Sequence, residues 1–164
     1  MADRRIFAYL VAGAVIALDR LTKWAVESRL SFFDTHKVIP GFFDIVRSEN
    51  RGVAFGILDA SNAGWRTPLL VLVSIAAVAM IGTMVWKTER LSRASLWGFG
   101  LILGGAAGNL FDRAVSGRVT DFLLFYVGSY QWPTFNIADS AIDIGAAVLI
   151  IDLIRSRRQA VHVP

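Results

Sequence analysis

Aspartate side chains are the residues of this chain that are best placed to do chemistry. An ionisable group at membrane depth is costly, so it usually faces a polar cavity, pairs with another group or serves a function. The chain has no cysteine, and its two histidines fit no HExxH pattern, so we expect chemistry without a metal or another cofactor. Six acids adjoin or interrupt apolar stretches: Asp19, Asp112, Asp121, Asp139, Asp143 and Asp152.

Asp121 and Asp139 are the two acids that the sequence can bring to the same depth. Asp121 follows the third apolar run and Asp139 opens the fourth, and the modest loop between these runs predicts antiparallel neighbouring helices. Two carboxylates at close range cannot both ionise cheaply, so one takes up a proton while the other stays charged. Such a pair supplies a general base for water and a general acid for a peptide carbonyl. From these residues alone, structural pairing and a proton or ion pathway remain open alternatives.

The other acids fit structural roles. Asp152 lies beside Arg155, and Asp112 is next to Arg113, where it can cap or pair at the end of a helix. Asp143 is one helical turn beyond the acid at position 139 on the same face, so it either tunes the proposed pair or only packs.

Asp19 and Lys23 are four residues apart on one helical face, in the order that favours an ion pair. A structural ion pair accounts for them at least as well as a direct catalytic role does.

Four apolar segments must position these side chains. The chain is 55% hydrophobic with a mean hydropathy of +0.53, which exceeds what a soluble domain of 164 residues needs for its core. The first run follows a basic pair like a signal peptide, but no small-residue cleavage site follows it. We therefore expect one domain, residues 1–164, with an all-α membrane fold of four transmembrane helices. The predicted helices are Ile6–Leu30, Pro68–Trp86, Ala94–Phe111 and Ile137–Ile154.

Basic residues predict how these helices are oriented, because Lys and Arg concentrate in short cytoplasmic flanks. Both termini should be cytoplasmic in a bacterial inner membrane, and the two longer loops, 31–67 and 112–136, should face the periplasm. The positive charge does not form a basic stripe with interleaved aromatics, so we expect no nucleic acid partner. The short flanks hold Arg4, Arg5, Lys87, Arg90, Arg93, Arg155, Arg157 and Arg158.

Two segments of the outer loops have the β-branched and aromatic content of strands, 42–47 and 119–126. A small β-containing region is therefore predicted on the periplasmic side. The third run carries Gly100, Gly104 and Gly108 at four-residue spacing, which predicts a close helix contact.

Five ordered blocks resemble the lipoprotein signal peptidase (signal peptidase II) family over nearly the whole chain. One block alone would be weak evidence, but together and in order they are highly specific. The blocks are Asp19-Arg20-Leu21-Thr22-Lys23, Asn50-Arg51-Gly52-Val53-Ala54-Phe55-Gly56, Gly104-Gly105-Ala106-Ala107-Gly108-Asn109-Leu110-Phe111-Asp112-Arg113, Val119-Thr120-Asp121-Phe122 and Phe135-Asn136-Ile137-Ala138-Asp139-Ser140.

The resemblance implies an aspartic endopeptidase with Asp121 and Asp139 as its catalytic pair. It implies a prolipoprotein substrate, cleaved before a diacylglyceryl-modified cysteine in contact with membrane lipid. Asp19 and Lys23 would mainly support the structure. Four further residues would shape the site and hold substrate: Asn50, Asn109, Arg113 and Asn136.

The sequence departs from the family pattern at three positions. Arg20 stands where glutamine is usual, Val53 replaces a common alanine, and Asp143 adds an acid where an uncharged residue is common. None of these removes a proposed catalytic residue, although Asp143 argues against a simple two-carboxylate pH profile.

Three rival functions are worth stating. A small proton- or ion-coupled transporter would predict acids near the bilayer midplane and repeated helix pairs, and the sequence shows no such repeat. A serine-lysine signal peptidase is disfavoured because Lys23 and Lys87 lie far from any serine in a recognisable pattern. A purely structural membrane subunit leaves the paired Asn and Asp blocks unexplained.

Overall fold

The computed structural model describes residues 4–51, 65–88 and 91–161, and these form four helices and four strands. The four helices predicted from the apolar runs are confirmed. The last one continues seven residues past the predicted end at Ile154, through an arginine-rich segment. Gly52 to Gly56 of the outer-loop block lie outside the described residues. The helices are α1 (Arg4–Arg29), α2 (Arg66–Lys87), α3 (Arg93–Ser116) and α4 (Ile137–Val161).

Two of the described helices, α2 and α3, are long and apolar enough to cross a membrane by length and composition. Very few residues of α2 are buried although they are almost all apolar, which suits a lipid environment. The helices α1 and α4 are equally long, but ionisable side chains interrupt both of them.

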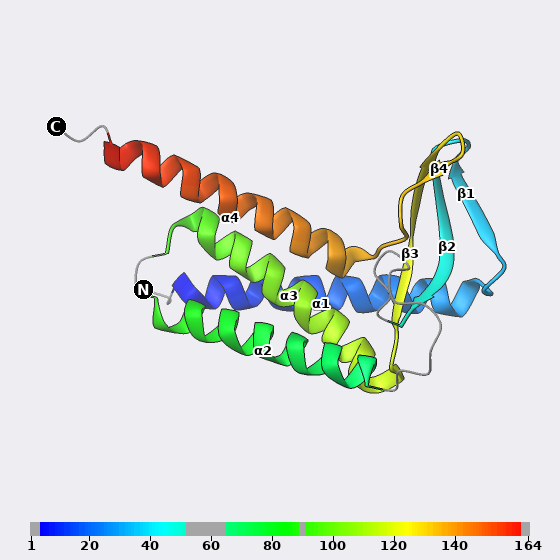
Figure 1. Ribbon diagram of the computed structural model, residues 1–164, viewed down its shortest axis with the longest axis horizontal. Coiled ribbons are helices and arrows are strands. Elements are labelled where there is room, and N and C mark those ends of the chain that lie inside the picture. The colour runs from blue at the N-terminus through cyan, green and yellow to red at the C-terminus, as the bar shows by residue number, and fades with distance from the viewer. Residues whose placement is uncertain (1–3, 52–64, 89–90, 162–164) are drawn as a thin grey trace.

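The central helix of the bundle is α3, which packs against the other three (Figure 1). Its glycines explain how closely the helices approach, as the spacing predicted. A Cβ atom at Gly104 would lie 2.7 Å from the carbonyl oxygen of Ala12 on α1, and one at Gly105 would overlap the carbonyl oxygen of Ala138 on α4. The sites at which α3 contacts α1 and α4 therefore need glycine.

The end of α3 directs the chain into the sheet. Gly117 adopts a left-handed conformation with φ of 72° and donates its N–H to the carbonyl of Arg113, which ends the helix. Strand β3 (Val119–Val127) begins two residues later. This turn places the start of β3, and with it Asp121, beside the last turns of α3.

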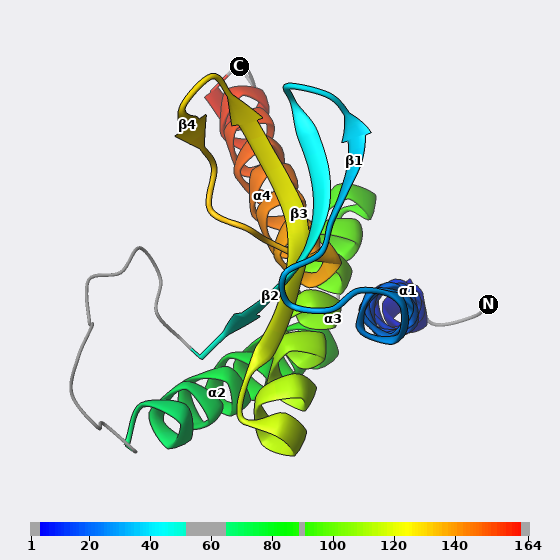
Figure 2. The ribbon, with the colours of Figure 1, turned by 90° about the vertical axis from the view of Figure 1, so that its right-hand side faces the viewer.

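The sheet contains β1 (Thr35–Ile39), β2 (Phe43–Asn50), β3 and β4 (Tyr130–Gln131) in that antiparallel order. The two predicted strands are confirmed as β2 and β3, but β1 and β4 were not predicted. Strand β1 mixes polar and apolar residues and is exposed along its length, so its sequence carries little strand signal. Viewed from the sheet end, Figure 2 shows β3 leading from the end of α3 across the bundle.

Polar contacts attach the sheet to the end of α1. Arg47 on β2 donates hydrogen bonds to the carbonyl oxygens of Glu27 and Leu30, at 3.0 and 3.1 Å, which satisfies two of the free carbonyls at the end of the helix. Thr120 on β3 donates to the Glu27 carboxylate at 2.6 Å. The sheet is thereby held at one end of the bundle, away from both termini (Figure 1).

Candidate active site

Asp121 lies on β3 with only 2% of its surface exposed. Strand pairing sets it opposite Ser48 on β2, so its side chain is placed by the sheet. Its Oδ1 accepts a hydrogen bond of 2.7 Å from the side-chain amide of Asn136, and Asn50 at the end of β2 also hydrogen-bonds this carboxyl. Two predicted site asparagines therefore contact the same carboxyl group.

Asp139 lies in the first turn of α4 and is half-buried. Its Oδ2 accepts from the backbone N–H of Asn136 at 3.2 Å, while Asn136 Oδ1 accepts from the backbone N–H of Asp139 at 3.0 Å. This reciprocal pair is a capping box in which aspartate takes the place of the usual glutamate or glutamine. The start of the helix also favours a negative charge. The local structure thus holds the Asp139 carboxyl group in one orientation.

Two buried asparagines connect the carboxyl groups. Asn109 on α3 donates from Nδ2 to Asp139 Oδ1 at 2.7 Å. Asn136 donates from Nδ2 both to Asp121 at 2.7 Å and to Asn109 Oδ1 at 3.3 Å. A continuous chain of amide groups therefore joins the strand acid to the helix acid, and three elements, α3, β3 and the start of α4, meet at this point.

The two carboxyl groups, Asp121 and Asp139, lie in different electrostatic environments. Burial, and to a smaller extent the charge of Asp139, raises the pKa of the Asp121 carboxyl from 3.8 to about 6, although hydrogen bonds from Asn50 and Asn136 oppose the rise. A proton on Asp121 beside a charged Asp139 is the arrangement that acid-base chemistry on a carbonyl needs.

Behind the asparagines lies a buried ion cluster centred on Lys23. Its ammonium donates to Asp19 at 2.7 Å, to Asp112 at 2.6 Å and to Asn109 Oδ1 at 3.1 Å, so all three of its donors are used. The predicted ion pair of Asp19 with Lys23 is confirmed. Asp19 also accepts from the backbone N–H of Ala138, which fixes the start of α4 against α1.

The expectation that Asp112 caps or pairs at the end of α3 is confirmed, but its ion-pair partners come from α1. Asp112 forms ion pairs with Lys23 and with Arg20, whose guanidinium also lies over the Phe111 ring. Consecutive residues on a helix point in different directions, which explains why the adjacent arginine is not the partner.

Arg113 is half-buried on α3, one helical turn after Asn109. Its Nη1 lies 3.5 Å from the backbone oxygen of Asn109, and its buried Nε has no hydrogen-bond partner among the described residues. Part of the guanidinium therefore retains donor capacity one helical turn from Asn109.

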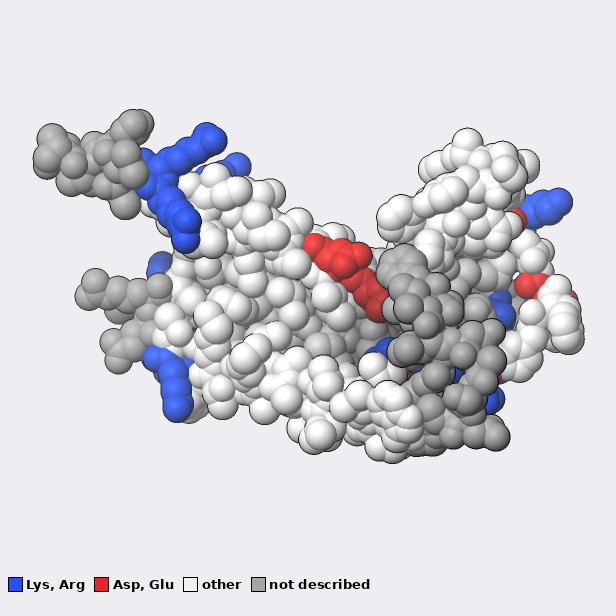
Figure 3. Space-filling view, viewed as in Figure 1, with Lys and Arg blue, Asp and Glu red and all other residues white. Residues whose placement is uncertain are grey.

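The last two acids lie outside this network. Asp143 is exposed on α4, and acidic surface is visible in Figure 3 where α4 begins beside the sheet. Asp152 accepts hydrogen bonds from Ser92 at 2.6 Å and Ser95 at 2.5 Å, so it joins the far end of α4 to the start of α3. Its role is structural, as predicted, but its hydrogen-bond partners are serines.

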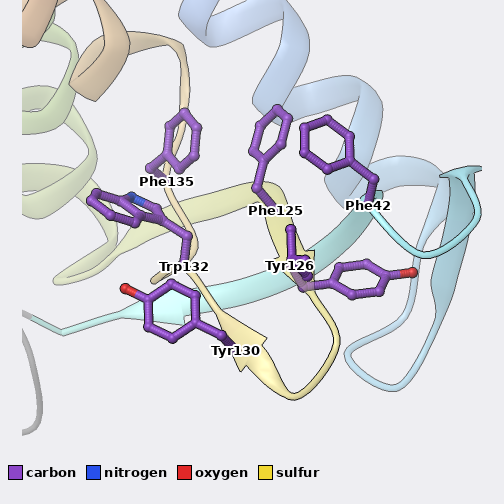
Figure 4. Close-up of a pocket in the computed structure, with 7 residues that line it drawn as sticks. Phe42, Phe125, Tyr126, Tyr130, Trp132 and Phe135 are labelled. Carbon is purple, nitrogen blue, oxygen red and sulfur yellow. The ribbon is translucent and has the colours of Figure 1, made fainter.

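An aromatic pocket of about 360 Å³ opens on the sheet (Figure 4). Phe125 on β3 stacks on Phe43 and on Phe135, with ring centroids 4.6 and 5.8 Å apart. Because side chains alternate along a strand, Phe125 and Asp121 lie on the same face of β3, about 13 Å apart along the strand at 3.3 Å per residue. The pocket is lined by Phe42, Phe125, Tyr126, Val127, Tyr130, Trp132 and Phe135.

Comparisons with known proteins agree with this architecture. The family model described as signal peptidase (SPase) II matches residues 11–155. The chain is 60% identical over 163 residues to a lipoprotein signal peptidase of Solibacter usitatus, covering 99% of each protein. It is 39% identical to a lipoprotein signal peptidase of Maridesulfovibrio salexigens, covering 94% of this chain and 99% of the relative.

The chain belongs to the signal peptidase II family.

Solved structures support the same assignment. A bacterial membrane enzyme determined at 2.3 Å superimposes with a TM-score of 0.80 at 29% identity, covering 92% of this chain and 88% of that one. Another, determined at 1.9 Å, gives 0.78 at 30% identity, covering 89% and 91%. Signal peptidase II activity follows from the family, and none of these matches supports the rival transporter function.

Sequence reasoning missed two features of this signal peptidase II site. One is the capping box, which the spacing Asn136-x-x-Asp139 before an apolar run signals. The other is the ion pair of Arg20 with Asp112, for which the sequence has no signal because 92 positions separate the two residues.

Proposed function

We propose that this protein is an aspartic endopeptidase that removes the signal peptide from diacylglyceryl-modified prolipoproteins by cleaving before the lipidated cysteine. Asp121 and Asp139 are its catalytic pair, and the reaction needs no metal. The observation that carries this proposal is the chain of amide hydrogen bonds through Asn136 and Asn109 that joins the two carboxyl groups.

The proposed reaction divides the roles of the two acids. The Asp139 carboxylate takes a proton from a water molecule, whose oxygen attacks the carbonyl carbon of the scissile peptide bond. Asp121 donates its proton to the carbonyl oxygen, which forms a neutral tetrahedral intermediate. When the C–N bond breaks, the amine of the lipidated cysteine takes up a proton from Asp139, and the proton of the intermediate returns to Asp121. The raised pKa of Asp121, about 6, supports this division.

The neighbouring polar residues hold the pair and the substrate. Asn50, Asn109 and Asn136 orient the carboxyl groups through hydrogen bonds. Arg113 offers planar, permanently charged donors to a substrate carbonyl or to the glycerol ester oxygens of the lipidated cysteine. Its partly unsatisfied guanidinium supports this assignment.

All four helices cross the membrane in this proposal. The helices α1 and α4 have 26 and 25 residues, and at 1.5 Å per residue they reach about 38 Å, more than the roughly 30 Å hydrocarbon core. Their charged groups Asp19 and Lys23 are fully buried and paired, so lipid does not meet them. A single domain, residues 1–164, then comprises the four spans and the sheet.

The orientation places both termini in the cytoplasm of a bacterial inner membrane and the sheet in the periplasm. Basic side chains are visible at both ends of the molecule in Figure 3, but those at the end that holds both termini belong to short flanks of the helices, such as Arg93, Arg157 and Arg158. This distribution supports the proposal because short cytoplasmic segments carry an excess of Lys and Arg.

The aromatic pocket receives an apolar part of the precursor close to the scissile bond. Phe125 joins the pocket to the strand that carries Asp121, so a ligand in the pocket lies on the same face of β3 as this acid. Membrane lipid and the acyl chains of the substrate are the apolar groups available at this depth.

The decisive experiment is cleavage of a lipidated prolipoprotein by the purified protein in detergent. We expect a product that begins with the diacylglyceryl cysteine, identified by mass spectrometry, and a far slower reaction with the same precursor lacking lipid. The Asp121→Asn variant serves as the blank for contaminating peptidases. Equal rates for the two precursors would refute the lipoprotein specificity.

A further inference from the structure

A second pocket lies at the end of the helices opposite the sheet, between the start of α1 and the start of α3. It has a volume of about 470 Å³, within the range of small-molecule sites. Its lining combines two arginines with three apolar side chains. The lining residues are Arg4, Phe7, Arg93, Leu96 and Trp97.

The charged and apolar parts of this pocket lie at different depths. Arg4 and Arg93 are the first residues of their helices and both are exposed. Phe7 and Trp97 follow three and four residues later, about 5 Å further along the helix axes at 1.5 Å per residue. Their rings make an edge-to-face contact with centroids 5.0 Å apart, and the buried Leu96 also lines the pocket. The pocket is therefore charged at the end of the bundle and apolar further along the helix axes.

The charge of the pocket selects an anion. None of the described lining residues is acidic. Asp152, near the far end of α4, lies close to the start of α3, but its carboxylate is engaged by Ser92 and Ser95 and does not line the pocket. A guanidinium binds phosphate oxygens through parallel N–H donors, and two of them can enclose one phosphate group. The two helix N-termini add further positive potential here.

We propose that this pocket binds one anionic phospholipid of the cytoplasmic leaflet. The two arginines hold its phosphate, and its acyl chains run past Phe7 and Trp97 along the surface of the spans. The site is separate from the proposed catalytic pair, although its place at the cytoplasmic surface rests on the proposed topology. The pocket has basic residues at its outer end and an apolar wall further along the helices. This combination matches a negatively charged lipid better than a soluble anion.

The test measures the thermal unfolding midpoint of the purified, delipidated protein in detergent during titration with phosphatidylglycerol, phosphatidylcholine or inorganic phosphate. The variant Arg4→Gln/Arg93→Gln removes both phosphate ligands. The control Arg157→Gln/Arg158→Gln removes the same charge from exposed positions at the same end of the bundle. Circular dichroism and the midpoint without lipid establish that each variant folds.

We expect phosphatidylglycerol to stabilise the parent and the control equally, and the pocket variant to need at least 10-fold more of this lipid. Phosphatidylcholine and inorganic phosphate should give little stabilisation. Equal responses of pocket variant and control, or equal responses to both lipids, would overturn the proposal. Stabilisation by phosphate alone at the same concentration would assign the pocket to a soluble anion instead.

A parallel assay, cleavage of the lipidated precursor in detergent, tests the proposed function separately from this inference. Lipid binding is read from unfolding, so it is measured whether or not the protein cleaves this substrate. Selective phosphatidylglycerol binding without cleavage would leave the pocket assigned and refute the peptidase mechanism. Cleavage without selective lipid binding would support the peptidase mechanism and refute the lipid site.

Discussion

Lys23 donates a hydrogen bond to Oδ1 of Asn109 at 3.1 Å, and Nδ2 of the same amide donates to Asp139 at 2.7 Å. An ammonium can only donate, so it requires the oxygen of the amide on its own side and turns the nitrogen towards the acid. The buried ion cluster therefore orients the proposed catalytic carboxylate through one asparagine.

This relationship predicts two separable effects of changing Lys23. The variant Lys23→Met should lower the free energy of unfolding by about 3–5 kcal/mol, because buried carboxylates lose their cation. The double variant Lys23→Met/Asp19→Asn should recover much of this stability, since Asp112 keeps its ion pair with Arg20. Turnover should stay low in both because Asn109 is no longer oriented. Chemical unfolding and cleavage assays check this, and full activity in the double variant would contradict it.

The proposed pair predicts a loss of about 10²–10⁴-fold or more in turnover for Asp121→Asn or Asp139→Asn, because an amide cannot exchange the required proton. Both proteins should fold and insert normally. Asp152→Asn is the matched control, since an amide oxygen still accepts from Ser92 and Ser95, and we expect nearly unchanged rates. Near-normal turnover of either variant of the pair would remove it from the mechanism.

The raised pKa of Asp121 predicts how stability depends on pH. The folded protein binds this proton up to about pH 6, whereas the unfolded chain releases it near 3.8. Between these values the folded state holds more protons, so stability falls as pH rises, in total by about 3 kcal/mol for a shift of this size.

Asp121→Asn removes this ionisation. Its unfolding midpoint should exceed that of the parent at pH 7 to 8, and the difference should disappear below about pH 4. The same change at Asp143, which is exposed, should leave the pH profile of the parent intact. A difference between the Asp121 variant and the parent that is independent of pH would contradict the assignment.

The close contact of α3 with α4 at Gly105 predicts that stability and turnover depend on the spacing of these two helices. A methyl group there would overlap the carbonyl of Ala138, two residues after Asn136, so Gly105→Ala should move α4 and reduce both stability and turnover. We expect a loss of about 1–3 kcal/mol, as for overpacking elsewhere. Gly82→Ala on α2, where no atom of the described residues lies within 4 Å of the added carbon, should be neutral. Parallel unfolding curves and rates test the contrast.

Labelling of single cysteines checks the proposed topology, because the chain contains none of its own. A cysteine at Ser129, exposed at the tip of the β3–β4 turn, should react with an impermeant reagent added to intact cells. A cysteine at Ser156, exposed near the end of α4, should react only after the membrane is opened. The reverse pattern would invert the orientation and place the sheet in the cytoplasm.

Local sequence was enough to predict the main elements. The runs that became α2 and α3 are long and free of internal charge, and the β-branched and aromatic segments became β2 and β3. These signals are local because burial of apolar surface and side-chain branching act within a few residues. The candidate acids Asp121 and Asp139 followed from their places at the ends of two such elements.

Tertiary structure alone decided how the polar side chains are connected. Lys23 meets Asp112 and Asn109 across 89 and 86 positions, and these contacts depend on how closely α1 approaches α3 at Gly104. The sequence signalled the close approach but not which side chains would face each other, so it could not identify Lys23 and Arg20 as the partners of Asp112. Rotation and register of packed helices arise from the whole interface, which is why no local pattern could have determined them.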